Sequence, residues 1–111
     1  MSPRERLRLA TDTVAATQRG LPPAIRPLAE GVPVHFDAVP AADLLEDGLE
    51  PDILGLFSGE PPGETSDHPL PAQIHLFLDN LWDYAEGDPA IFRDEVRLTY
   101  LHELGHYLGW D

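Results

Sequence analysis

Prolines and glycines interrupt this chain so often that only two long helices fit into it. Of its 111 residues, 12 are proline and 9 are glycine, and both residue types tend to end or bend a regular element. The longest candidate helix runs from about Pro89 to Leu108, because Asp88 can cap it and Pro89 suits its first turn. This pattern excludes a helical bundle and indicates short elements joined by many turns.

A second long helix is predicted at the start of the chain. Ser2 can cap it, Pro3 suits the first helical position, and Glu5 completes a capping box with Ser2. Gly20 and the proline pair that follows it end this helix. Shorter helical turns are expected at 25–28, 41–46 and 80–86.

Three segments between the two long helices are typical of β-strands. Alternating apolar residues predict strands at 32–36 and 73–79, and 53–57 is the third candidate. We therefore predict an α+β fold in which a small mixed β-sheet packs against the N-terminal helix and the C-terminal helix on one face. The sequence leaves the strand order open. We expect one domain over residues 1–111.

In the last of these strands, Ile74, Leu76 and Leu78 are predicted to face one way and His75 the other. The segment 58–71 holds four prolines and two glycines and is predicted to be a surface loop.

The charge of the chain narrows its possible partners. Seven arginines, no lysine and 20 acidic residues give a formal net charge of −13, which disfavours both nucleic acids and anionic membranes. No apolar run approaches the roughly 20 residues of a spanning helix, and the first twelve residues are charged and polar. We therefore expect a cytoplasmic protein without a signal peptide.

Two further features limit the metal chemistry. The chain has no cysteine, so disulfides and thiolate-bound zinc are excluded. An acidic cluster is interpreted as a solvated face, because the ligand spacing of a calcium loop is absent. It consists of Asp43, Glu46, Asp47, Glu50 and Asp52.

The predicted C-terminal helix contains His102-Glu103-Leu104-Gly105-His106, which is an HExxH motif. Residues four apart lie on one face of a helix, about 6 Å apart along its axis. Two imidazoles in this arrangement can bind one zinc ion, and a neighbouring carboxylate can take a proton from water at the metal. The motif therefore predicts zinc ligands at His102 and His106 and a general base at Glu103.

The third metal ligand is less obvious. Catalytic zinc normally has three protein ligands and a water, but only five residues follow His106. Gly109 can end the helix and turn the chain back toward the metal, which makes Asp111 the preferred third ligand, assisted or replaced by the C-terminal carboxylate. The alternatives are His35, His68 and His75, each of which is also typical of an ordinary surface or half-buried histidine.

The segment HELGHYLGWD, at the end of a helix in a small acidic chain, resembles the zincins, and most of all the minimal-zincin family of small bacterial metallopeptidases. The strands ILGLFSG and LPAQIHLF resemble the same family outside the motif, and the order of elements is similar over most of the chain. The resemblance implies a mixed sheet over which the active helix packs, with one edge strand free to bind an extended peptide. It also implies that His102 and His106 are ligands, that Glu103 is the general base and that Gly109 is the turn glycine.

Two positions depart from the wider pattern. The third ligand of metzincin-like motifs would fall at position 112, one residue beyond Asp111, and the chain has no methionine other than Met1 to form a Met-turn.

These residues favour a zinc-dependent peptidase whose peptide or protein substrate adds to the sheet edge. The net negative charge favours basic peptides. One alternative is a metal-binding or protein-interaction module without turnover, and another is a structural domain without metal. Tyr100 and Tyr107 are interpreted as packing residues rather than as stabilisers of an oxyanion.

Overall fold

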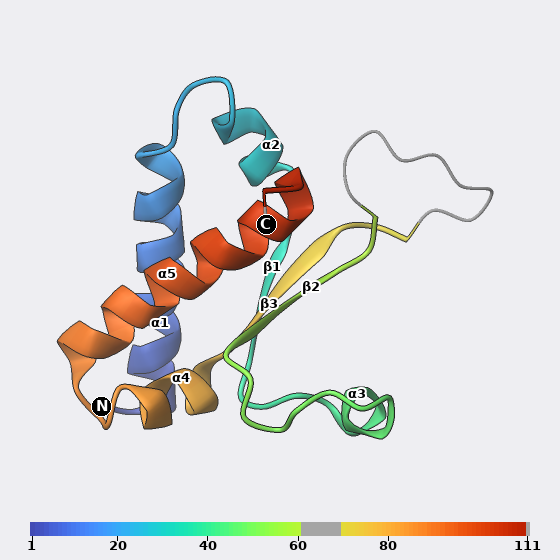
Figure 1. Cartoon of the computed structure of the whole chain (residues 1–111). Helices are drawn as coiled ribbons and strands as arrows, with labels where there is room; N and C mark the ends of the chain where they lie inside the picture. Colours follow the sequence, from blue (N-terminus) through green and yellow to red (C-terminus); the bar gives the residue numbers. More distant parts are fainter. Residues whose placement is uncertain (61–69, 111) are drawn as a thin grey trace.

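The computed structural model describes residues 1–60 and 70–110, and it has the α+β architecture predicted from the sequence (Figure 1). Two long helices lie at the ends of the chain, and the strands lie between them in sequence. The elements in chain order are α1 (Pro3–Arg19), α2 (Arg26–Glu30), β1 (Val34–Asp37), α3 (Ala42–Glu46), β2 (Gly55–Ser58), β3 (Gln73–Phe77), α4 (Leu78–Tyr84) and α5 (Pro89–Leu108).

Both long helices begin at the predicted caps. The Ser2 hydroxyl accepts a hydrogen bond from the Glu5 backbone N–H, and the Glu5 carboxylate accepts one from the Ser2 N–H, both at 3.1 Å. The hydrogen bond that the Ser2 backbone N–H donates to the carboxylate is the main reason why the pKa of the Glu5 carboxyl is lowered, because it stabilises the charged form. At the start of α5, the Asp88 carboxylate accepts hydrogen bonds from the backbone N–H groups of Ala90 and Ile91. The capping box and the aspartate cap are thus confirmed.

The three strands of the described residues form one mixed sheet in the order β1-β3-β2. β1 pairs with β3 in parallel, so that Val34 lies opposite Ile74, and β2 pairs with β3 in antiparallel, so that Gly55 lies opposite Leu76. The central strand is therefore the last of the three in sequence, and β2 forms one edge of the sheet.

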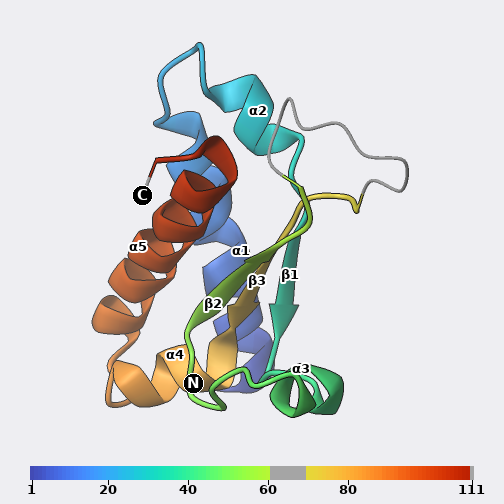
Figure 2. The same cartoon turned by 45° about the vertical axis from the view of Figure 1, so that its right-hand side comes forward.

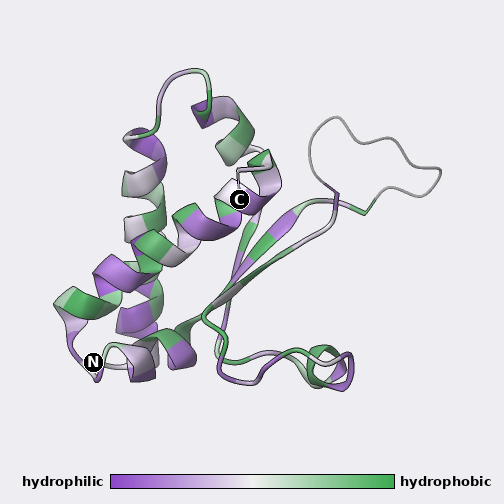
Figure 3. Cartoon of the chain, viewed as in Figure 1, coloured by the Kyte–Doolittle hydropathy of each residue, from purple (hydrophilic) through white to green (hydrophobic). Residues whose placement is uncertain are grey.

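The long helices lie on one face of this sheet, as predicted (Figure 2). Ile74 and Leu76 of β3 are completely buried on that face, because α5 packs directly against β2 and β3 and α1 packs against α5. Hydrophobic and hydrophilic residues alternate along both helices (Figure 3), as an element with one buried side requires. The residues that α1 and α5 contribute to the core are Ala10, Val14, Phe92, Val96, Tyr100 and Leu104.

Element boundaries differ from the sequence prediction by one or two residues. Strand β3 ends at Phe77, and Leu78 is buried as the first residue of α4 instead of extending the strand. Strand β1 runs from Val34 to Asp37 because its extent follows its pairing with β3, whose Ile74 N–H donates to the Pro33 carbonyl at 3.0 Å. Most of the predicted 58–71 loop lies outside the described residues. None of the described helices is long and apolar enough to cross a membrane.

Candidate metal centre

The C-terminal half of α5 brings the two motif histidines together on its exposed side. The Nε2 atoms of His102 and His106 lie 3.1 Å apart, and the two ring centroids are 4.6 Å apart. Both side chains are exposed to solvent. The i,i+4 spacing therefore produces the convergence that the motif predicts.

Glu103 is placed differently from its histidine neighbours. It is only 7% exposed, and it lies on the side of α5 that faces strand β2. At β2, Gly55 allows the strand to approach the helix closely, because an added Cβ would lie 2.7 Å from Thr99 Cγ2 and 3.3 Å from Glu103 Cγ. The edge strand and the proposed base are thus in direct contact.

Gly55 is a site residue that the sequence analysis did not single out. The signal was present, because an isolated glycine within a strand pattern often marks a close backbone approach. What the sequence does not reveal is the neighbour that approaches, since Thr99 and Glu103 lie more than forty residues away along the chain.

A cavity of about 420 Å³ opens beside the motif, between the start of β2 and α5. His102 and Glu103 form one wall of the cavity, and Leu54 and Leu98 contribute apolar surface to its lining. Its lining residues are Leu54, Gly55, Leu98, Thr99, His102 and Glu103. The arrangement can therefore hold a ligand group directly next to the two motif side chains.

The donor atoms at this centre fit a zinc ion. Within the part of the chain that the structure describes, His102, Glu103 and His106 are the one group of at least three metal-ligating side chains whose ligand atoms all lie within 4.8 Å of one another. Two imidazole nitrogens bound to a tetrahedral zinc at about 2.0–2.1 Å are about 3.4 Å apart, close to the 3.1 Å observed between the Nε2 atoms. Imidazole is also a ligand that zinc prefers.

The helix ends two residues after the second histidine, at Leu108, through a Schellman motif. Gly109 adopts the left-handed conformation with φ 77°, its N–H donates to the His106 carbonyl, and the Trp110 N–H donates to the Gly105 carbonyl at 2.7 Å. Gly105 contributes as well, because a Cβ there would lie 3.2 Å from the Trp110 carbonyl oxygen. Asp111 lies outside the described residues, so its assignment as third ligand stays a prediction.

Two of the alternative histidine ligands, His35 and His75, do not join this centre. Since Ile74 and Leu76 point toward α5, His75 points to the opposite face of the sheet, and its neighbour in register, His35, lies beside it there. His68 lies outside the described residues.

The two tyrosines of α5 pack against neighbouring elements, as predicted. Tyr100 is completely buried, and its hydroxyl accepts a hydrogen bond from Gln18 Nε2 at 3.0 Å. Burial raises the pKa of this phenol, because it disfavours the phenolate. Tyr107 packs edge-on against Phe57, with 5.8 Å between ring centroids.

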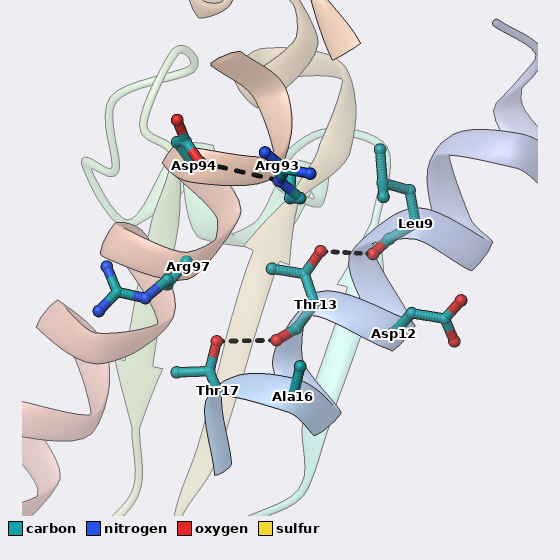
Figure 4. Close-up of a pocket in the computed structure, with 8 residues that line it drawn as sticks. All are labelled: Leu9, Asp12, Thr13, Ala16, Thr17, Arg93, Asp94 and Arg97. Atoms are coloured by element: carbon teal, nitrogen blue, oxygen red, sulfur yellow. Dashed lines mark hydrogen bonds and ion pairs between the residues drawn. The ribbon is translucent and has the colours of Figure 1, made fainter. Parts of the chain in front are cut away.

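A separate crevice of about 350 Å³ lies between α1 and α5 (Figure 4). On α1, the hydroxyls of Thr13 and Thr17 bond back to helix carbonyls, at 2.7 Å in each case. The α5 side of the crevice is lined by Arg93 and Arg97. At 100° per residue, these arginines project from the opposite side of α5 to the motif histidines, so the crevice is not part of the metal centre.

Comparison with known families gives one match. The family of zincin-like metallopeptidases matches residues 29–111, a range that contains the whole sheet, α5 and the motif. The match leaves out α1, which ends at Arg19. No curated protein matches the chain. With three quarters of its length matched and the HExxH side chains converging at one point, the chain belongs to the zincin-like metallopeptidase family.

Proposed function

We propose that this protein is a zinc-dependent peptidase in which His102 and His106 bind the metal, Asp111 completes the ligand set and Glu103 is the general base. The observation that carries the proposal is the 3.1 Å distance between the Nε2 atoms of two exposed histidines beside a buried carboxylate. Family membership supports a metallopeptidase, and the imidazole donors support zinc.

The edge of β2 supplies the substrate-binding surface. The Phe77 N–H donates to the Leu54 carbonyl at 3.0 Å, and hydrogen-bonded pairs alternate along an antiparallel ladder. Leu56 and Ser58 therefore bond to β3, whereas the N–H and C=O groups of Gly55 and Phe57 point to the open edge. An extended peptide can pair with these groups, which aligns its backbone beside Glu103.

Chemistry at this position follows from the side chains. His102 and His106 would hold the zinc ion, which when bound would supply a Lewis acid for the substrate carbonyl and for water. Glu103 accepts a proton from the attacking water and returns it to the departing amine. The close contact between β2 and α5 fixes the distance between the paired peptide and the carboxylate. The cavity lined by Leu54 and Leu98 accepts an apolar substrate side chain next to the scissile bond.

The test combines metal content with cleavage of a peptide library. We expect wild type to retain one zinc and to cleave, and Glu103→Gln to retain zinc while losing at least about a hundredfold in rate. Glu95→Gln, on the same helix, is the matched control and should cleave normally. If the zinc-loaded wild type and Glu103→Gln are equally inert, catalysis is rejected.

The ligands have their own test. His106→Ala should lose zinc, whereas His35→Ala, which removes another exposed histidine, should keep it. Asp111→Asn should weaken zinc binding by about tenfold or more if this residue is the third ligand. Unchanged affinity in Asp111→Asn would assign that position to another group.

The second candidate is a metal-binding module without turnover. It is favoured by the small number of elements at the site, since the described residues that line its cavity come from α5 and the start of β2. Such a module would show a higher melting temperature with zinc and no cleavage of any peptide, which separates it from the peptidase.

A further inference from the structure

The face of the sheet opposite α5 carries a second set of chemically distinctive side chains. Strand alternation places His35 and Asp37 of β1 there, together with His75 and Phe77 of β3 and Leu56 of β2. We call this the outer face. Figures 1 and 2 show α1 and α5 on the other side of the sheet, and α3 beyond one end of it.

A cavity of about 480 Å³ lies between the outer face and the segment that contains α3. Its walls combine two carboxylates with an apolar and aromatic surface. Asp37 and Asp43 supply the carboxylates, and none of the described residues that line the cavity is an arginine. The apolar part is made by Val39, Leu44, Leu56 and Phe77.

The partly exposed ring of His75 lines this cavity, and it lies between the His35 ring and the buried Phe77 ring. The His35 and His75 rings stack with 5.1 Å between centroids, and the His75 and Phe77 rings are nearly parallel, with an interplanar angle of 10°. His75 Nδ1 lies 3.2 Å from one carboxylate oxygen of Asp37. The Asp43 side chain makes no ion pair within residues 1–60 and 70–110, so acceptor capacity remains on both aspartates.

We propose that this cavity binds an arginine side chain presented by a basic segment of another protein. A guanidinium is planar and forked, so it can stack on the partly exposed His75 ring while it donates to Asp37 and Asp43. The aliphatic stem of the arginine covers the leucine and valine surface. A lysine ammonium carries the same charge, but it has no planar group that could stack on an aromatic ring.

Charge complementarity points to the same occupant. Residues 37–52 contain six acidic and no basic residues, in a chain whose net charge is −13. The potential around this segment therefore attracts cationic groups. A metal ion fits less well, because the His35, His75 and Asp37 side chains do not form a converging ligand group in the described residues.

This site is independent of catalysis, and β2 connects it to the proposed substrate edge. Gly55 contacts Glu103 on one face of that strand, while the next residue, Leu56, lines the arginine cavity on the other. A protein held through an arginine on the outer face is thus kept close to the β2 edge.

Binding can be measured without turnover. The probe is a fluorescein-labelled peptide, Gly-Leu-Arg-Leu-Gly, titrated against the full chain carrying Glu103→Gln. Peptides with Lys or Gln in place of Arg test the side chain. We expect the Arg peptide to bind at least about fivefold more tightly than the Lys peptide, and the Gln peptide to bind most weakly.

Substitutions in the chain locate the site. Asp37→Asn and Asp43→Asn should each weaken binding of the Arg peptide about five- to tenfold. Asp47→Asn removes the same charge from a neighbouring exposed position that does not line the cavity, so it should leave binding within about twofold. Amide chemical-shift changes should map to Leu56, His75 and Phe77.

The proposal is overturned if the three peptides bind equally, if Asp47→Asn weakens binding as much as Asp43→Asn, or if the shifts map to His102 and His106. Asp43→Asn serves as the second variant in case Asp37→Asn disturbs the His75 contact, and melting temperatures identify any variant that fails to fold. Because no step involves zinc or cleavage, an inactive centre would not affect the result.

Discussion

Substituting Gly55 with alanine tests the contact that joins the sheet edge to the proposed base. The added methyl would lie 2.7 Å from Thr99 Cγ2, 3.1 Å from the His75 carbonyl oxygen and 3.3 Å from Glu103 Cγ. Carbon atoms pack best at about 3.5–4.0 Å, so the first contact overlaps by about 1 Å. Strand β2 must therefore move away from α5 or the Thr99 side chain must shift.

The magnitude follows from two opposing effects. Overpacking of this kind destabilises by about 1–3 kcal/mol, while replacing glycine with alanine within a strand recovers about 0.5–1 kcal/mol. We therefore expect Gly55→Ala to lower the free energy of unfolding by about 1–2 kcal/mol, which corresponds to a drop of about 4–8 °C in melting temperature. Thr99→Ser removes the nearest atom, so in that background the loss should shrink by about 1 kcal/mol.

Urea denaturation of the four proteins in this double-mutant cycle is the assay, with Gly20→Ala as the control. At Gly20, which has φ −85°, the nearest atom to an added Cβ is 3.6 Å away, so alanine should be neutral or slightly stabilising. The reasoning fails if Gly55→Ala is as stable as wild type, or if Thr99→Ser restores nothing.

Three further predictions use other parts of the structure. Gly109→Ala should destabilise by about 1–2 kcal/mol in urea, because φ 77° is strained for alanine; a free energy of unfolding equal to that of wild type would contradict the Schellman assignment. Since the pKa of Tyr100 is raised in the folded state, its stabilising contribution is complete below the ordinary tyrosine value of about 10 and is lost as pH rises through the folded value. Unfolding curves from pH 8 to 11 should therefore fall less steeply for Tyr100→Phe than for wild type. Zinc affinity should decline below about pH 6, because protonated imidazole cannot bind a metal; equilibrium dialysis giving one constant from pH 5 to 8 would argue against histidine ligands.

The ends of the helices could be predicted from local sequence because local groups determine them. Ser2, Glu5, Asp88 and Gly109 each satisfy backbone groups within a few residues of their own position. Those interactions form in any fold that keeps the helix, so the local sequence is sufficient to predict them.

The sheet is different, because its order depends on contacts between distant residues. Strand β3 pairs with segments about 20 and 40 residues earlier in the chain, and no local pattern in Gln73–Phe77 shows that it is central. The early end of the strand at Phe77 has a similar cause. The backbone N–H of Asp79, two residues after Phe77, donates to the Ala38 carbonyl in the turn after β1. Apolar alternation alone continues through Leu78.

The candidate site also has one part that local sequence determines and one part that depends on distant residues. One helical turn fixes the approach of His102 and His106, and the motif alone predicted it. The burial of Glu103 depends on Gly55 from another element, and that contact required the three-dimensional structure. The role of Asp111 as third ligand stays a prediction, which the zinc affinity of Asp111→Asn tests.

Helix α1 has a practical consequence for defining the smallest fragment that can fold. It precedes the matched family region, yet Ala10 and Val14 belong to the same buried cluster as Phe92 and Val96, and Gln18 bonds the Tyr100 hydroxyl. A fragment trimmed to the homologous segment would uncover the back of the helix that bears HExxH. A fragment whose ends are chosen from the family match alone would therefore expose apolar core residues to solvent and aggregate. The N-terminal residues belong in any minimal version of the protein.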